Sequence, residues 1–169
     1  NYEMERELLL HPDMTLSRRI AYGSNELQCE QIDSFIRERV DLLIVSPNEA
    51  KQVQPAVTRA YRAGIPVIVA DRRVPGDEWT AFIGGDNYKV GQLMAQWVIG
   101  KASDKGSKAK GKPFVVLEVA GLPGSTPATL RHKGMMEGIE EAKGEGLEAK
   151  VEVQSVMGSW YKENAYEVV

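Results

Sequence analysis

Cysteine is almost absent from this sequence. The single residue, Cys29, cannot form a disulfide within the chain. Its amphipathic surroundings predict a packed helical position rather than a reactive one. No apolar stretch is long enough to span a bilayer, and no signal peptide is visible. The cysteine content therefore does not indicate in which cellular compartment the protein works. We expect any attachment to a membrane to come only through flanking regions.

Residue sets typical of catalysis and metal binding are missing as well. The two histidines, His11 and His132, lack the spacing of metal ligands, and we expect both at the surface. No Gly-x-Ser-x-Gly elbow occurs. The loop over residues 121–126 lacks the Gly-Lys-Ser/Thr ending of a nucleotide loop, which favours a tight turn capped by Ser125 or Thr126. We therefore predict a binding domain with no catalytic residues, no metal and no cofactor.

The chain has no excess of positive charge, although lysine residues cluster in one local run. The 169 residues carry a formal net charge of −3, which gives no support to a general polyanion-binding role. The cationic run over residues 101–112 has no interleaved aromatic residues on which bases could stack. We expect this run to be a flexible surface loop, and we expect no contact between this chain and nucleic acid.

What the sequence does contain is a regular alternation of short apolar runs and amphipathic segments. Such alternation is typical of a doubly wound α/β fold, in which helices cover both faces of a parallel sheet. We predict strands over residues 15–22, 42–45, 66–70, 81–84, 114–119 and 148–157. We predict helices over residues 2–11, 24–39, 49–63, 86–99 and 127–143, and from 163 onward. The basic run then divides the chain into an N-terminal lobe (1–100), a hinge loop (101–112) and a partial C-terminal lobe (113–169).

Polar side chains follow two neighbouring strands of this predicted sheet. Ser46 comes after one strand, and Asp71 and Arg72 come directly after the next. A doubly wound sheet binds ligands at the carboxyl ends of its strands. A carboxylate accepts hydrogen bonds and a guanidinium donates them, so the pair can bind neighbouring hydroxyls of a sugar ring. The alternative is an Asp–Arg ion pair that closes the loop.

Two aromatic residues, Trp160 and Tyr161, follow the last predicted strand. An aromatic side chain at a strand end can stack on the apolar face of a sugar. It can equally cover the hydrophobic core of its own lobe, and the sequence leaves both interpretations open.

At these motifs the chain resembles the type I periplasmic sugar-binding proteins, the ribose-binding-like family. The resemblance covers nearly the whole chain, and its motifs occur in order. The segment over residues 64–72, Gly-Ile-Pro-Val-Ile-Val-Ala-Asp-Arg, is similar to the family motif whose Asp-Arg pair binds sugar hydroxyls. Residues 42–47, 85–91 and 118–134 are similar to further strand–helix junctions of the family.

The resemblance also implies which residues contact the ligand, and at some of these positions this chain differs from the family. Ser46 stands where many members have asparagine, and Thr129 stands where members often have a sugar-binding arginine. Arg131 matches a second arginine that is usually not the main contact, whereas Trp160 falls where a stacking aromatic is common. The implied ligand-binding residues are therefore Ser46, Asp71, Arg72, Thr129 and Trp160.

Residues 45–50 and 123–132 resemble more specifically the periplasmic sensor domains of hybrid two-component histidine kinases from Bacteroides-type bacteria. That resemblance implies a carbohydrate sensor that closes its lobes on a mono- or small saccharide in the periplasm. Two alternatives remain, a solute-binding protein of a sugar ABC transporter and the effector domain of a lac-type repressor.

Compared with the family, the chain is expected to lack the first, central strand and most of the second lobe. A sheet without its central strand exposes apolar edges. We therefore expect a homodimer partner, a swapped segment or further residues to complete the sheet. Direct pairing of residues 15–22 with residues 42–45 in an ordered monomer would contradict this expectation.

Overall fold

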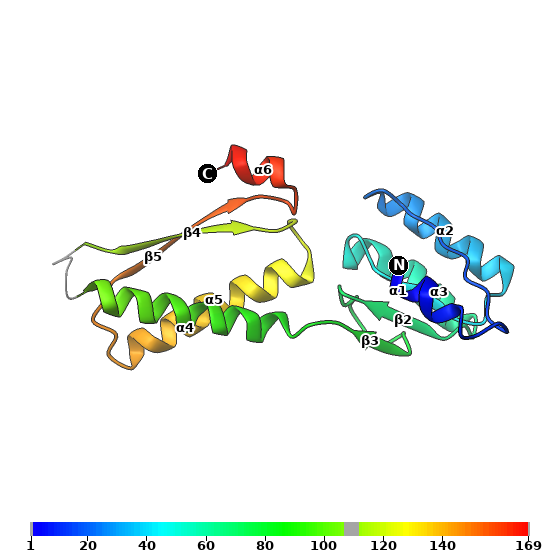
Figure 1. Ribbon diagram of the computed structural model, residues 1–169, viewed down its shortest axis with the longest axis horizontal. Helices are drawn as coiled ribbons and strands as arrows, with labels where there is room; N and C mark the ends of the chain where they lie inside the picture. The colour runs from blue at the N-terminus through cyan, green and yellow to red at the C-terminus, as the bar shows by residue number, and fades with distance from the viewer. Residues whose placement is uncertain (1, 107–111, 169) are drawn as a thin grey trace.

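The computed structural model describes residues 2–106 and 112–168, which form two units lying side by side (Figure 1). The first unit holds a parallel three-stranded sheet of order β1-β2-β3, and the second holds a parallel pair, β4-β5. The first unit contains α1 (Tyr2–Leu8), α2 (Asn25–Glu38), β1 (Leu43–Val45), α3 (Ala50–Arg62), β2 (Val67–Ala70) and β3 (Ala81–Ile83). The second contains α4 (Asn87–Gly106), β4 (Phe114–Ala120), α5 (Thr126–Gly144), β5 (Val151–Met157) and α6 (Lys162–Glu167). The predicted α/β class with parallel strands is confirmed.

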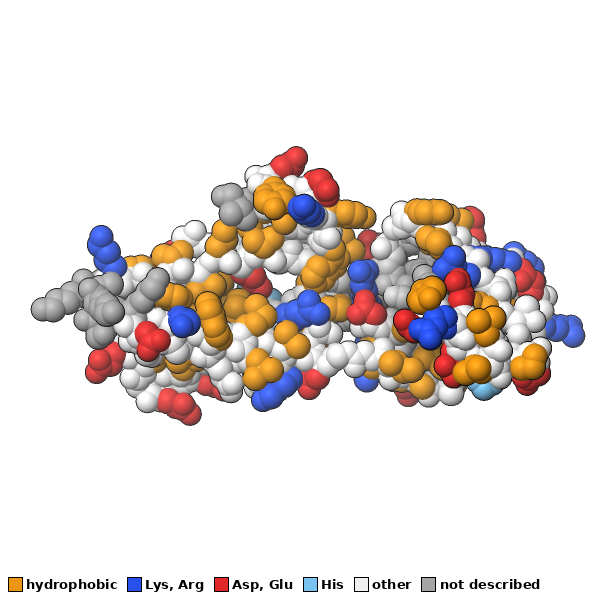
Figure 2. Space-filling view, in the orientation of Figure 1, with side chains coloured by type: hydrophobic (Ala, Val, Ile, Leu, Met, Phe, Trp, Pro, Cys, Tyr) orange, Lys and Arg blue, Asp and Glu red, His pale blue; other side chains and the backbone are white. Residues whose placement is uncertain are grey.

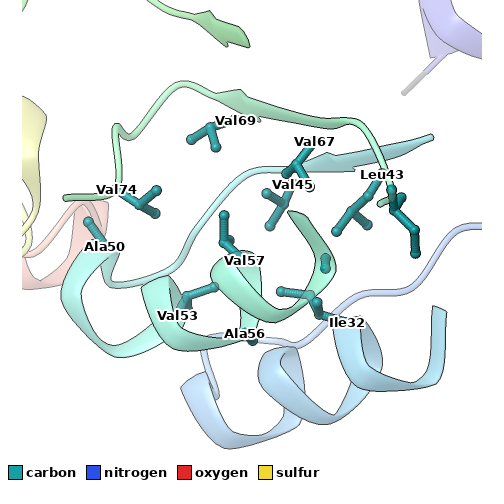
Figure 3. Packing of buried hydrophobic residues seen from close by; sticks show 12 residues of the cluster. Ile32, Leu43, Val45, Ala50, Val53, Ala56, Val57, Val67, Val69 and Val74 are labelled. Atoms are coloured by element: carbon teal, nitrogen blue, oxygen red, sulfur yellow. The ribbon is translucent and has the colours of Figure 1, made fainter. Parts of the chain in front are cut away.

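The core of the first unit lies between its sheet and α3, with α2 packed beyond α3 (Figure 3). The inward-facing strand residues are fully or almost fully buried, as are the small residues of α3 that pack against them. With Ile32 of α2 and the loop residues Ile65 and Val74, they form one buried cluster: Ile32, Leu43, Val45, Ala50, Val53, Ala56, Val57, Ala60, Ile65, Val67, Val69 and Val74. The packing fixes the register of the sheet, in which Val45 lies beside Val69 and Ala70 lies beside Ile83. The carboxyl ends of all three strands therefore meet at one edge.

In the second unit, α4 and α5 pack together on one face of the β4–β5 pair, and α6 lies on the other face (Figure 1). Glycines allow the two helices to approach closely. A Cβ atom on Gly91 would overlap the carbonyl oxygen of Arg131, and one on Gly134 would overlap that of Tyr88. Behind this contact the buried set comprises Ala95, Val98, Ala102, Met135, Ile139 and Val151. Hydrophobic side chains also remain on the exposed surface of both units (Figure 2).

The predicted strand over residues 15–22 is wrong. These residues form no ladder with any strand, and side chains of α2 and of the segment itself hold them against that helix. Gln31 donates to the carbonyl oxygen of Ile20 at 3.1 Å, and Arg19 pairs with Glu38. A strand needs a neighbouring strand with which to pair, and this segment has none among the described residues.

The predicted end of the fourth helix also differs from the structure. α4 continues to Gly106, so residues 101–106 of the predicted loop are helical, while residues 107–111 lie outside the described part of the chain. The apolar face of α4 packs on α5 rather than on the first sheet, which assigns α4 to the second unit. As a consequence α3 covers one face of the first sheet, and Ile44 on the other face is 45% exposed. Within the described residues, one face of the first sheet is therefore uncovered, whereas helices lie on both faces of the β4–β5 pair (Figure 1).

The outer edge of β1 is open. β1 pairs with β2 on one side, and no described strand lies on its other side. The direct pairing of residues 15–22 with β1 that would have contradicted a missing strand is not observed. A partner that completes this edge stays a prediction.

Candidate functional site

Asp71 lies at the common edge formed by the carboxyl ends of the first sheet. Its backbone N–H donates to the carbonyl oxygen of Ile83 at 2.8 Å, so the residue is tied to the end of β3 as well as to β2. Its φ angle of 66° lies in the left-handed region, which aspartate tolerates better than most residues. Because the side chain is 65% exposed, its carboxylate oxygens can accept hydrogen bonds from a ligand.

Arg72 turns toward the loop after β1 instead of toward solvent. Its Nη1 donates to the carbonyl oxygens of Asn48 and, at 3.5 Å, Pro47, and the side chain is 20% exposed. Nε lies 3.7 Å from Oδ2 of Asp71, so the ion pair considered as an alternative is present. Arg72 thus joins the two strand ends that the sequence singled out, and Asp71 is the more accessible member of the pair.

A hydrogen-bond network from α2 fixes the loop that carries Ser46. The side-chain amide of Gln28 donates to the carbonyl oxygen of Ser46 at 2.9 Å and accepts from the N–H of Asn48 at 2.8 Å. Oδ1 of Asn25 accepts from the N–H of Glu49 at 3.1 Å and from the side chain of Asn48 at 3.0 Å. Ser46 itself is exposed, so the loop is held through its backbone while the hydroxyl stays accessible.

Trp160 occupies the corresponding edge of the second unit. Both Ser159 and Trp160 have left-handed φ angles, 51° and 67°, which is uncommon for residues other than glycine and often marks a functional position. The indole lies against Gly121, where a Cβ atom would overlap the ring, and remains 46% exposed. The ring therefore covers its own strand end and still presents surface to solvent, so the two interpretations of Trp160 are compatible.

Thr129 and Arg131 differ in what their polar atoms contact. The hydroxyl of Thr129 donates to the carbonyl oxygen of Ser125 at 3.1 Å, within the first turn of α5. The guanidinium of Arg131 lies 5.7 Å from the centroid of the Trp160 ring, and Nε donates to Oδ1 of Asn87 at 2.8 Å. Arg131 is thus the candidate that the sequence left aside. Its place in the family pattern was visible, but its contact with Trp160 depends on tertiary structure.

Further polar groups lie near the same end of the second unit. Oε2 of Glu118 is 2.7 Å from Nδ1 of His132 and accepts from the hydroxyl of Ser155 at 2.5 Å. The hydroxyl of Tyr88 donates to Glu137 at 2.7 Å, and this hydrogen bond raises the pKa of Tyr88. Among the described residues, no group of three or more His, Cys, Asp or Glu side chains is placed to hold a metal ion.

The turn over residues 121–126 has the structure of a βα junction. Ser125 is the N-cap of α5, but its buried side chain makes no capping bond. Pro127, at the second helical position, has no N–H to donate. The expected cap is therefore confirmed in position, and no side-chain hydrogen bond accompanies it.

Comparisons with known proteins agree with this architecture. A family model described as periplasmic binding protein domain matches residues 14–169. The fructose-binding periplasmic domain of a hybrid two-component system is 34% identical, with a TM-score of 0.82, and the alignment covers 96% of this chain and 50% of that one.

Two curated relatives bind other sugars. The D-xylose-binding periplasmic protein of Haemophilus influenzae is 23% identical over 99% of this chain and 49% of that protein. The galactofuranose-binding protein of Escherichia coli is 29% identical over 75% of this chain and 39% of that protein. The chain spans about half the length, or less, of the curated relatives it matches. No helix within the described residues is both long and apolar enough to cross a membrane.

Proposed function

We propose that this chain, which belongs to the family of periplasmic binding protein domains, recognises a monosaccharide between its two units and serves as the sensor region of a two-component receptor. The observation that carries the proposal is the exposed carboxylate of Asp71, held at a strand end beside the guanidinium of Arg72. This arrangement sets an acceptor next to a donor, and vicinal sugar hydroxyls can bond to both.

The second unit supplies a surface of different chemistry. An exposed indole can pack on the apolar C–H face of a sugar ring, and Trp160 is oriented by its backbone and by Gly121. Arg131, beside the ring, adds hydrogen-bond donors. A sugar held between these surfaces would form hydrogen bonds through its hydroxyls with Asp71 and Arg72 and would pack its apolar face on Trp160.

Closure of the two units follows from this division of contacts. A sugar that touches both units favours the arrangement in which both sets of contacts form together. Within the described residues, the chain passes from one unit to the other between β3 and α4, so the angle between the units can change at this segment (Figure 1). In a receptor, this change would alter the geometry passed on to a membrane segment outside this chain.

The sensor role is favoured by the similarity to the fructose-binding periplasmic domain, which is more similar in sequence than the two curated relatives described above. The second candidate is a periplasmic solute-binding protein that delivers sugar to a transporter, and the curated xylose- and galactofuranose-binding relatives favour it. Both place the chain in the periplasm. A homodimer partner or an added strand at the open edge of β1 would complete the first sheet.

Calorimetry with D-fructose, D-xylose, D-ribose and methyl galactofuranoside on the natural full-length protein tests the binding proposal. We expect one of these sugars to bind, and Asp71→Ala to weaken its binding about tenfold or more, because hydrogen bonds to a charged group are lost. The matched control is Asp41→Ala, an exposed aspartate at the opposite end of β1. Equal affinity of Asp71→Ala and wild type would show that the site is wrongly assigned.

Deletion of the gene in its host separates the two roles. A sensor is required for the sugar to induce transcription, whereas a transport protein is required for uptake of labelled sugar. Loss of uptake with normal induction would favour the transporter role.

A further inference from the structure

The segment joining the two units, residues 84–86, contacts a site residue of the first unit. The carbonyl oxygen of Ile83, immediately before the segment, accepts from the N–H of Asp71 at 2.8 Å. The backbone then passes so close to Asp71 that a Cβ atom on Gly84 would lie 3.2 Å from its carbonyl oxygen. At the far end, Oδ1 of Asp86 accepts from the N–H of Lys89 at 2.9 Å and caps α4.

The same segment is also tied to the second unit through the buried side chain of Asn87. The residue is 7% exposed, so both ends of its amide need partners. Nδ2 donates to the carbonyl oxygen of Gly85 at 3.1 Å, and Oδ1 accepts from Nε of Arg131 at 2.8 Å. One side chain therefore holds the joining segment and an arginine on α5 at the same time.

Arg131 extends this connection to the aromatic surface. Its guanidinium lies 5.7 Å from the centroid of the Trp160 ring. The contacts thus run from Trp160 through Arg131 and Asn87 to the carbonyl oxygen of Gly85. Any ligand that moves the guanidinium changes the partner of Asn87.

We propose that Asn87 is a positioning residue that couples the ligand surface of the second unit, Arg131 and Trp160, to the segment joining the two units. This inference rests on the proposed function and adds a means of regulation to it. Coupling of this kind is reciprocal: ligand contact at Arg131 favours one setting of the joining segment, and that setting orients Arg131 for the ligand. Asn87 itself, being buried, need not touch the sugar.

Hydrogen exchange in the sugar-free, natural full-length protein tests the coupling without any ligand. The readout is exchange at Lys89 and Val90, whose N–H groups donate to Asp86 directly after the joining segment. We expect Arg131→Ala to speed this exchange about tenfold, because the charged partner of Asn87 is lost. Glu140→Ala, which removes an exposed carboxylate from the same helix without touching Asn87, should leave it unchanged. Unchanged exchange in Arg131→Ala would overturn the inference.

A second variant tests the coupling with D-fructose as the probe. Asn87→Asp keeps an oxygen that accepts from Arg131, but it loses the N–H group that donates to the carbonyl oxygen of Gly85. The variant therefore leaves Arg131 anchored while it releases the segment that joins the two units. By X-ray scattering, we expect the decrease in radius of gyration that D-fructose causes in wild type to become smaller in Asn87→Asp. Gln96→Ala, an exposed position on α4, is the control and should behave as wild type.

The possible outcomes distinguish the inference from the function on which it rests. If D-fructose decreased the radius of gyration of Asn87→Asp as much as that of wild type, the coupling would be overturned, and the proposal of sugar binding would stand. Failure of the wild-type protein to bind any tested sugar would count against the proposed function, and the exchange experiment would still decide whether Asn87 couples the two parts.

Discussion

The close approach of α4 and α5 predicts opposite effects for the same substitution at two glycines of α4. At Gly91, an added Cβ would overlap the carbonyl oxygen of Arg131 and lie 2.8 Å from the N atom of Met135. Both obstacles are backbone, so the helices must separate. At Gly100 no atom lies within 4 Å of the added Cβ, and the position is exposed. Gly100→Ala is therefore a matched control on the same helix.

The magnitudes follow from overpacking and helix propensity. Overpacking destabilises by about 1–3 kcal/mol, and the rigid backbone at Gly91 places that substitution at the upper end. Replacing glycine by alanine inside a helix stabilises the helix by about 1 kcal/mol. We expect Gly91→Ala to lower the free energy of unfolding of the second unit by about 2 kcal/mol. Gly100→Ala should raise it by about 1 kcal/mol.

Native-state hydrogen exchange of the buried residues Met135 and Ile139 on α5 measures these changes within the second unit alone. The two variants should then differ by about 3 kcal/mol, which is roughly a hundredfold in exchange rate. If Gly91→Ala exchanged as slowly as Gly100→Ala, the described contact between the helices would be refuted.

Three further predictions concern other parts of the chain. Gly121→Ala should leave thermal stability nearly unchanged, because the indole of Trp160 can rotate away from the new Cβ, but it should weaken sugar binding by calorimetry; wild-type affinity would contradict this. The hydrogen bond from Arg19 lowers the pKa of Glu38. The contribution of this bond to stability is therefore fully present above the ordinary carboxyl pKa, and it is lost as the pH falls through the lowered pKa of Glu38. Arg19→Ala should raise that pKa in an NMR titration, and an unchanged titration would exclude the contact. Burial raises the pKa of the Cys29 thiol, so a disulfide reagent should react with it at higher pH than with an exposed cysteine; equal pH profiles would argue against its burial.

The features that could be predicted from sequence are those set by local contacts. Ser24 caps α2 by accepting from the N–H of Leu27 at 3.1 Å, an interaction contained within three residues. The apolar runs that became β1, β2 and β4 were recognisable because each is short and almost continuously apolar, although one face of β1 and of β4 is exposed in the structure. The polar residues at the strand ends were located for the same reason.

The features that sequence could not predict depend on distant partners. Residues 15–22 stand between two helical segments, where the α/β pattern of the chain predicts a strand, but whether a strand forms depends on a neighbour that the local sequence does not contain. The apolar face of α4 indicated burial without indicating which unit would bury it. Arg72 and Asn48 lie 24 positions apart, and Arg131 and Asn87 lie 44 apart, so only the folded chain reveals these contacts.

The amide clamp of Gln28 has a consequence for how the ligand specificity of such a protein can change. Gln28 bonds only to backbone atoms of the loop, the carbonyl oxygen of Ser46 and the N–H of Asn48. The shape of the loop is therefore independent of the side chain at position 46, which is exposed. Ser46 can be exchanged for another polar residue without refolding the loop, so this position offers selection, or a protein engineer, a place to alter the preferred sugar while stability is preserved.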